Sequence, residues 1–152
     1  MKSPALILFL LLLPGWLAGR ALAVPATPAE PNIIVMLVDD NPADRDVLTL
    51  LVNEALPGAQ VVVFESGIQA LVAIGQKAPD IVITDIVMPH MNGIEMLRQL
   101  ATQCVVRPRL IVAVSSFTPQ QLAQKGELPP GVRSISKPID PQPFIAVLQS
   151  VI

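Results

Sequence analysis

Short apolar runs alternate with amphipathic segments from residue 33 to the end of the chain. Continuous apolar runs bounded by polar residues are typical of parallel β-strands that are covered on both faces. The runs predict strands at Ile33–Val38, Ala59–Phe64, Ile81–Thr84, Leu110–Val114 and Val132–Ser136.

Helical spacing of apolar residues fills the segments between these strands. Helices are expected over 43–56, after Ser66–Gly67, from Asn92–Gly93, from Thr118–Pro119 and over 143–152. Thr118 is a residue type that caps a helix N-terminus, and Pro119 suits the first helical position; Asp140–Pro141 repeats this arrangement before the last helix. The apolar stripes also predict that Val47, Ile68 and Val72 face the sheet.

Strands that alternate with helices over about 120 residues imply right-handed crossover connections. The predicted fold class is therefore α/β, a doubly wound five-stranded parallel sheet within a three-layer αβα sandwich. The chain has 152 residues, enough for one domain with a substantial core.

The first 32 residues are expected to lie outside this domain. Residues 1–23 resemble a secretory leader, with Lys2 before the apolar run Ala5–Leu13 and the small-x-small pattern Ala21–Ala23. Residues 24–32 read as a Pro/Ala linker, so the domain covers 33–152. Either the true start lies further downstream, although Met36 falls within the first strand, or the domain is exported or tethered to the membrane by a retained leader.

Charge and cysteine content restrict the possible partners. Without residues 1–23 the chain has 8 basic and 12 acidic residues, a net charge of −4, which does not favour a nucleic-acid surface. Cys104 is the only cysteine, so an intramolecular disulfide is excluded. His90 is the only histidine and is expected to be a solvated loop residue.

Charged residues follow three of the predicted strands. Asp39–Asp40 follow the first strand, Asp85 the third and Lys137 the fifth. Because the carboxyl ends of parallel strands meet at one edge of the sheet, these side chains should gather there. Clustered carboxylates favour a divalent cation, and all-oxygen ligands suit Mg²⁺. A lysine and a hydroxyl nearby would stabilise a transferred phosphoryl group, with Asp85 as the candidate acceptor.

The region 33–152 resembles the receiver domain of two-component response regulators, the chemotaxis-regulator-like fold with sheet order 2-1-3-4-5. The matching motifs follow one another in the expected order. They are Asp39–Asp40, Asp85–Pro89 with Met91–Gly93, Ser115–Ser116 and Ser136–Pro138.

This resemblance implies that Asp85 accepts a phosphoryl group from a phosphohistidine on a sensor histidine kinase or histidine phosphotransfer protein. It also implies that Mg²⁺ is bound by Asp40 and Asp85 directly, by Asp39 through water and by the carbonyl of Val87. Lys137 and Ser115 would contact the phosphoryl oxygens. Such a domain is not an enzyme, beyond promoting its own phosphorylation and slow dephosphorylation.

One departure concerns the switch. Receivers usually have Tyr or Phe three residues before the lysine, whereas this chain has Ser134 there and contains no tyrosine. Output would then have to use Ser115, the loop 116–121 or the fourth helix.

Two hypotheses remain open. The chain is a stand-alone phosphoacceptor that acts on an unknown downstream protein, or it is a receiver-like interaction module that is not phosphorylated. A cytoplasmic location is favoured, because phosphodonors of this family depend on cytoplasmic ATP. Export or membrane tethering through the leader stays an alternative.

Overall fold

The computed structural model describes residues 32–103 and 107–152. The predicted leader, nearly all of the linker and Cys104 lie outside the described residues. Strands and helices alternate strictly in the described part of the chain. They are β1 (Ile34–Val38), α1 (Pro42–Ala55), β2 (Gln60–Phe64), α2 (Gly67–Gln76), β3 (Ile81–Asp85), α3 (Gly93–Gln103), β4 (Leu110–Ser115), α4 (Pro119–Lys125), β5 (Arg133–Ser136) and α5 (Pro141–Gln149).

The five strands form one parallel sheet in the order β2-β1-β3-β4-β5. This confirms the predicted fold class and the predicted strand order. The central strand β3 is buried along its whole length, as its continuous apolar sequence requires. Val38 of β1 lies beside Thr84 of β3, so the residues that end these two strands are brought to the same edge of the sheet.

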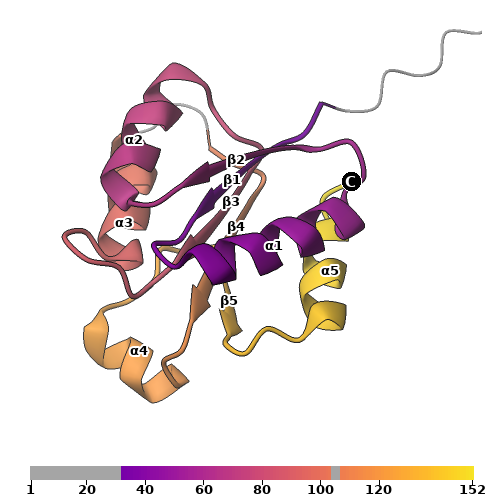
Figure 1. Ribbon diagram of the computed structural model, residues 1–152. Coiled ribbons are helices and arrows are strands. Elements are labelled where there is room, and N and C mark those ends of the chain that lie inside the picture. The colour runs from indigo at the N-terminus through magenta and orange to yellow at the C-terminus, as the bar shows by residue number, and fades with distance from the viewer. Residues whose placement is uncertain (1–31, 104–106) are drawn as a thin grey trace, which may run out of the picture. The chain divides into compact units, whose positions relative to one another are not determined.

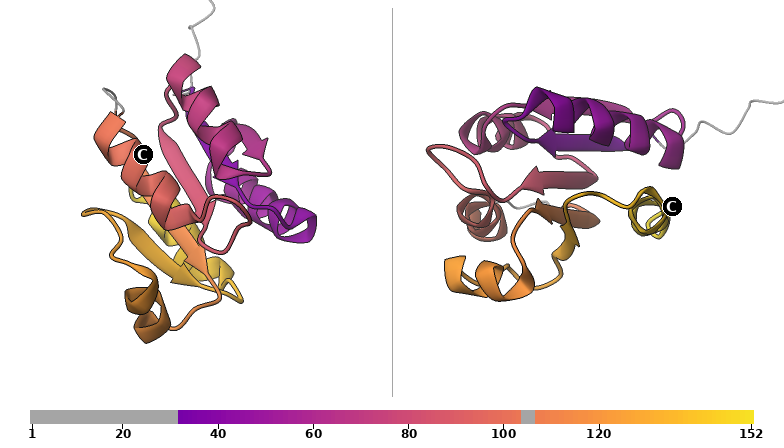
Figure 2. Two further views of the ribbon diagram at one scale, coloured as in Figure 1. Left: turned by 90° about the vertical axis from the view of Figure 1, so that its left-hand side faces the viewer. Right: turned by 60° about the horizontal axis from the view of Figure 1, so that its bottom comes forward.

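Helices cover both faces of the sheet (Figure 1). The helices α1 and α5 pack on one face through Leu48, Val52, Phe144 and Leu148. The helices α2, α3 and α4 pack on the other face, and Figure 2 shows this arrangement from two further directions. Within the described residues, no helix combines the length and apolar character needed to cross a membrane.

Three of the predicted core positions are wrong. Val47 is 51% exposed, Ile68 51% and Val72 62%, so these side chains point away from the sheet. The helix α2 instead buries Gly67, Ala70 and Ile74. The physical reason is that each helix contacts the sheet along a narrow stripe, and the flanking positions remain apolar without being covered.

Several element boundaries also differ from the predictions. The last helix begins at Pro141 rather than Pro143, because Asp140 caps it by accepting a hydrogen bond from the backbone N–H of Gln142. It ends at Gln149 rather than Ile152. The strands β3 and β4 each continue one residue further than expected, so Asp85 and Ser115 are the last residues of their strands. Both side chains are therefore held by the sheet itself.

Candidate functional site

Three carboxylates meet at the carboxyl edge of the sheet. Asp39 and Asp40 follow β1, and Asp85 ends the neighbouring strand β3. One carboxylate oxygen from each lies within 4.8 Å of the others. Asp39 and Asp85 are buried, whereas Asp40 is exposed. The predicted acidic residues are thus brought together in an arrangement that opens to solvent on the side of Asp40.

The backbone around Asp39 is held by local hydrogen bonds. Asp39 Oδ1 accepts from the backbone N–H of Asn41 at 2.8 Å, and the carbonyl of Asp39 accepts from the guanidinium of Arg45 at 2.9 Å. Arg45 also forms an ion pair with Glu65. These contacts fix the turn from β1 into α1, so the buried carboxylate has little freedom to move.

Lys137 follows β5 and points into this cluster. Its Nζ lies 3.2 Å from Asp39 Oδ2 and 3.5 Å from Asp85 Oδ2. Its backbone N–H donates to the carbonyl of Ser115 at 2.8 Å, which ties the loop after β5 to the end of β4. The predicted lysine therefore lies beside the predicted acceptor, although the closer of these two contacts is to Asp39.

Sequence reasoning missed one member of the site, Asp44. Its Oδ2 accepts a hydrogen bond from Lys137 Nζ at 2.7 Å, the shortest contact that this ammonium makes with a described residue. Asp44 lies in the first turn of α1. An acidic residue one turn after the Asp39–Asp40 pair, at the start of the predicted helix, was the signal that could have identified it.

Burial and neighbouring charges oppose each other at Asp85 and Lys137. Burial raises the pKa of Asp85 and the charge of Asp39 adds to this, while Lys137 lowers it; the net direction is upward. Burial by itself would lower the pKa of Lys137, but its hydrogen bond to Asp44 and the charges of Asp85 and Asp39 outweigh that effect and raise it. Lys137 is therefore held in its charged form.

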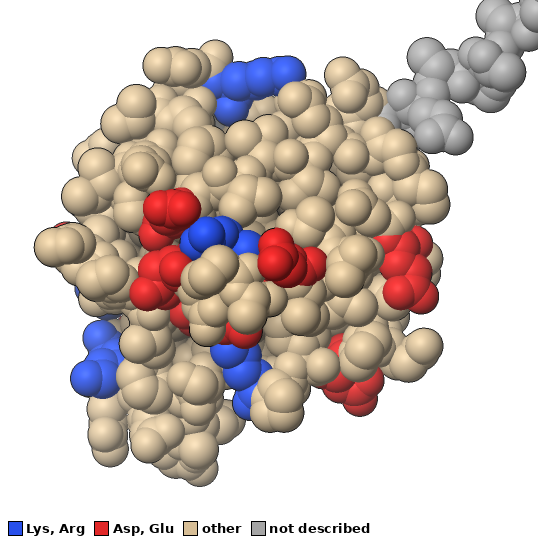
Figure 3. Space-filling model, in the orientation of Figure 1, with Lys and Arg blue, Asp and Glu red and all other residues tan. Residues whose placement is uncertain are grey.

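Negative charge exceeds positive charge in this cluster. The carboxylates of Asp39, Asp44 and Asp85 contact the single ammonium of Lys137, and that of Asp40 lies beside those of Asp39 and Asp85. Figure 3 shows acidic side chains around basic ones over the N-terminal part of α1, within a surface that is otherwise largely uncharged. An all-oxygen donor set with excess negative charge fits a hard divalent cation such as Mg²⁺.

Ser115 lies at the same edge, at the end of β4 next to β3. Its side chain is buried, and its Oγ accepts a hydrogen bond from the backbone N–H of Phe117 at 3.0 Å. The hydroxyl proton is not used in that bond.

The loop after β3 is shaped by close backbone contacts. A Cβ atom on Gly93 would overlap the carbonyl oxygen of Asp85, so only glycine allows α3 to begin this close to the strand. His90 in this loop has a φ of 68° and is exposed, as expected for a solvated residue. The N–H of Val87 donates to Asp85 Oδ1 at 3.3 Å, while a role for the Val87 carbonyl as a metal ligand stays a prediction.

A hollow of about 150 Å³ lies at the loop that follows Asp85. Val87 and Phe117 both line it, and the ammonium of Lys125 lies 5.7 Å from the centre of the Phe117 ring. Val87 is 45% exposed. Val87 and Phe117 thus line this hollow with apolar side chains, alongside the polar side chains of Asn92 and Lys125.

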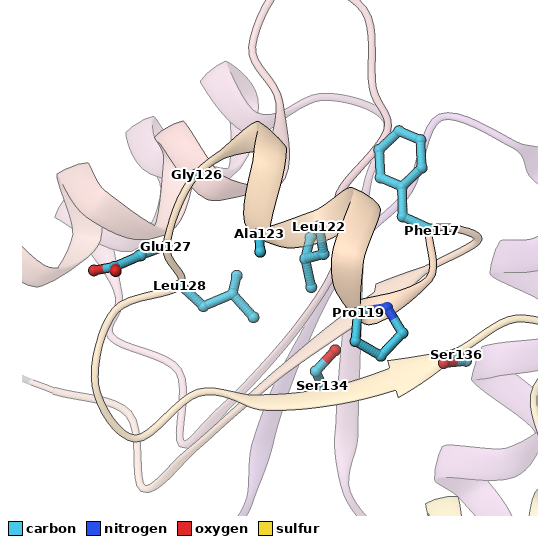
Figure 4. Close-up of a pocket in the computed structure, with 9 residues that line it drawn as sticks. All are labelled: Phe117, Pro119, Leu122, Ala123, Gly126, Glu127, Leu128, Ser134 and Ser136. Carbon is cyan, nitrogen blue, oxygen red and sulfur yellow. The ribbon is translucent and has the colours of Figure 1, made fainter.

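A larger cavity of about 490 Å³ lies between α4 and β5 (Figure 4). Ser134 points toward it from β5, and Leu122 and Leu128 approach from the side of α4. Ser134 is the position at which the receivers that this sequence resembles usually have Tyr or Phe, and its short side chain leaves the space next to α4 without a ring from β5.

Comparison with known proteins identifies one family. The model of the response regulator receiver domain matches residues 35–149. Protein PilH of Pseudomonas aeruginosa is 29% identical over 121 residues, which cover 78% of this chain and 96% of that protein. A protein-glutamate methylesterase/protein-glutamine glutaminase of Myxococcus xanthus is 34% identical over 107 residues, 70% of this chain but only 30% of its own length.

Solved structures agree in fold. A crystal structure of an uncharacterized protein from Neptuniibacter caesariensis is 28% identical, with a TM-score of 0.68 over 78% of this chain and 86% of that one. The chemotaxis response regulator CheY4 of Vibrio cholerae has a TM-score of 0.69 at 24% identity, over 80% of this chain and 100% of that one. The receiver domain of a Pseudomonas aeruginosa sensor histidine kinase, with a magnesium ion in its active-site cleft, has a TM-score of 0.68 at 21% identity, over 80% and 98%.

Proposed function

Because this chain belongs to the response regulator receiver domain family, we propose that it is a phosphoacceptor switch whose acceptor is Asp85. The observation that carries the proposal is the placement of Asp85 at the end of β3, with Lys137 3.5 Å away and the carboxylates of Asp39 and Asp40 beside it. Receiver domains are signalling modules rather than a family of enzymes.

The reaction is an in-line transfer of a phosphoryl group. A carboxylate oxygen of Asp85 attacks the phosphorus, a new P–O bond forms, and the bond from phosphorus to the donor breaks with its electron pair leaving on the donor. Burial raises the pKa of Asp85, which makes its carboxylate oxygen more basic, while the neighbouring charge of Lys137 opposes this shift and favours the ionised form. The protein contributes mainly position and charge.

Lys137 and Ser115 stabilise the transferred group. The ammonium of Lys137 can turn from the carboxylates to a phosphoryl oxygen, and the free hydroxyl proton of Ser115 can be donated to another. Asp39, Asp40 and Asp85 would hold the magnesium ion, with the carbonyl of Val87 as a further ligand. When bound there, Mg²⁺ supplies positive charge against the charge that develops on the phosphoryl oxygens.

Phosphorylation then acts as an electrostatic switch. The product adds about −1.5 to −2 charges at the carboxyl edge of the sheet. Because position 134 is a serine and not an aromatic residue, the response has to use Ser115, the loop 116–121 or α4, which borders the cavity in Figure 4. An unknown downstream protein would read this change.

The phosphodonor is a sensor histidine kinase or a histidine phosphotransfer protein. This partner, a cytoplasmic location and action as a stand-alone receiver are parts of the same proposal. The stand-alone reading is supported by the match to PilH, which covers 96% of that protein.

The proposal is tested by incubating the full chain with Mg²⁺ and acetyl phosphate and measuring its mass. One phosphoryl group should be added to the parent and to Asp46→Asn, a control that removes an exposed acid of α1, and none to Asp85→Asn. A parent that gains no phosphoryl group would refute the phosphoacceptor and support the alternative suggested by Ser134, an interaction module of the same fold. An unchanged gain in Asp85→Asn would refute the assignment of the acceptor.

A further inference from the structure

The ammonium of Lys137 is bound most closely by a residue outside the predicted acidic set. Its Nζ donates hydrogen bonds to Asp44 at 2.7 Å and to Asp39 at 3.2 Å, whereas Asp85 at 3.5 Å is only an ion-pair partner. In the unphosphorylated protein, the ammonium of Lys137 therefore lies closer to Asp44 of α1 than to Asp85.

Asp44 is presented by a rigid part of the fold. The start of α1 is fixed by Asn41, whose side chain accepts from the N–H of Ala43 at 3.0 Å, and by Pro42 in the first turn. The Lys137 side chain is 19% exposed and that of Asp44 is 37% exposed, so the pair is only partly screened by water. The contact is thus a defined ion pair and not a flexible surface encounter.

We propose that Asp44 is a positioning residue that draws Lys137 toward α1, so that its contact with Asp85 stays a 3.5 Å ion pair, and thereby slows phosphoryl transfer. This inference rests on the proposed function. A charge-assisted hydrogen bond to Asp44 has to be lengthened or shared when the ammonium turns to the incoming phosphoryl oxygens. While Lys137 stays with Asp44, it also competes less with a divalent cation for the carboxylate of Asp85.

Asp44→Asn removes the charge and keeps the size of the side chain. Lys137 should then move toward Asp85, with two measurable effects. At saturating Mg²⁺ and acetyl phosphate the phosphorylation rate should rise about two- to tenfold, the range expected for losing one partly exposed ion pair. The dissociation constant for Mg²⁺, measured from amide chemical shifts without any phosphodonor, should rise by a similar factor.

Two controls separate this role from simple charge or helix effects. Asp46→Asn removes the same charge from an exposed position of α1, and no ion pair of Asp46 is found in the described part of the chain, so both quantities should stay at parent values. In a Lys137→Met background, Asp44→Asn should leave Mg²⁺ binding unchanged, because Asp44 acts through the lysine.

Each outcome decides between the possibilities. An equal weakening of Mg²⁺ binding by Asp44→Asn with and without Lys137 would mean that Asp44 acts through its own charge, which overturns the inference. A phosphorylation rate in Asp44→Asn at or below that of the parent would also overturn it, while the phosphoacceptor function would stand. If the parent itself is not phosphorylated, the proposed function fails, and Mg²⁺ binding in the four variants still reports whether Asp44 and Lys137 are coupled.

Discussion

Gly93→Ala should destabilise the protein and disturb the site from a position that bears no functional group. Gly93 begins α3, and its N–H donates to the carbonyl of Ile86 at 3.0 Å. A Cβ atom added there would overlap the carbonyl oxygen of Asp85 and lie 3.0 Å from both the carbonyl carbon of Asp85 and the Cα of Ile86. All of these are backbone atoms, so no side chain can rotate away to make room.

The magnitude follows from comparing the two effects of the substitution. Overpacking against fixed atoms costs about 1–3 kcal/mol. Alanine in a helix is by itself favourable over glycine by about 0.5–1 kcal/mol, less in a first turn. We expect the free energy of unfolding to fall by about 2 kcal/mol, and Mg²⁺ binding to weaken because the end of β3 has to shift.

Gly75→Ala is the matched control. Gly75 lies within α2, is exposed, and a Cβ atom there would meet nothing within 4 Å. This variant should raise the free energy of unfolding by about 0.5–1 kcal/mol and leave Mg²⁺ binding unchanged. Urea unfolding and Mg²⁺ titration of both variants provide the measurements. If Gly93→Ala is as stable as Gly75→Ala, the close approach of α3 to Asp85 does not constrain this position and the reasoning is wrong.

Three further predictions concern the acidic cluster and the hollow lined by Val87 and Phe117. Asp85→Asn should be more stable than the parent at neutral pH. Because the pKa of Asp85 is raised in the folded state, the stability that its protonated form contributes is fully present at acid pH and is lost as the pH rises through that pKa. The free energy of unfolding, measured against pH, should therefore fall less in the variant than in the parent. Asp40→Ala should weaken Mg²⁺ binding about tenfold or more in an amide-shift titration, and parent-like affinity would remove Asp40 from the ligand set. Self-dephosphorylation should be slow, because the apolar side chains of Val87 and Phe117 cannot hold a water in line with the phosphorus. The double variant Val87→Asn with Phe117→Glu should lose phosphate about tenfold faster. Equal rates would show that these two positions do not set the lifetime of the phosphorylated protein.

The sequence by itself determined the fold and the edge at which the site lies. Apolar runs such as Ile81–Thr84 can only be buried on both faces, and helical stripes between them leave few arrangements besides a doubly wound parallel sheet. Since Asp39, Asp85 and Lys137 each stand at or after a strand end, their meeting at one edge follows from the parallel topology. Local signals were equally sufficient at Thr118, where the structure has a full capping box with Gln121.

Only the tertiary structure decided which apolar residues are covered and which acid binds the lysine. Ile68 and Val72 have the same hydrophobicity as core residues, but whether they are buried depends on how far α2 is rotated over the sheet, which periodicity does not specify. Asp44 and Lys137 are far apart in the sequence, and their contact depends on the angle at which α1 leaves β1 and on the rotamer of a long side chain. The need for glycine at position 93 likewise arises from the distance between α3 and β3, a quantity that exists only once the chain is folded.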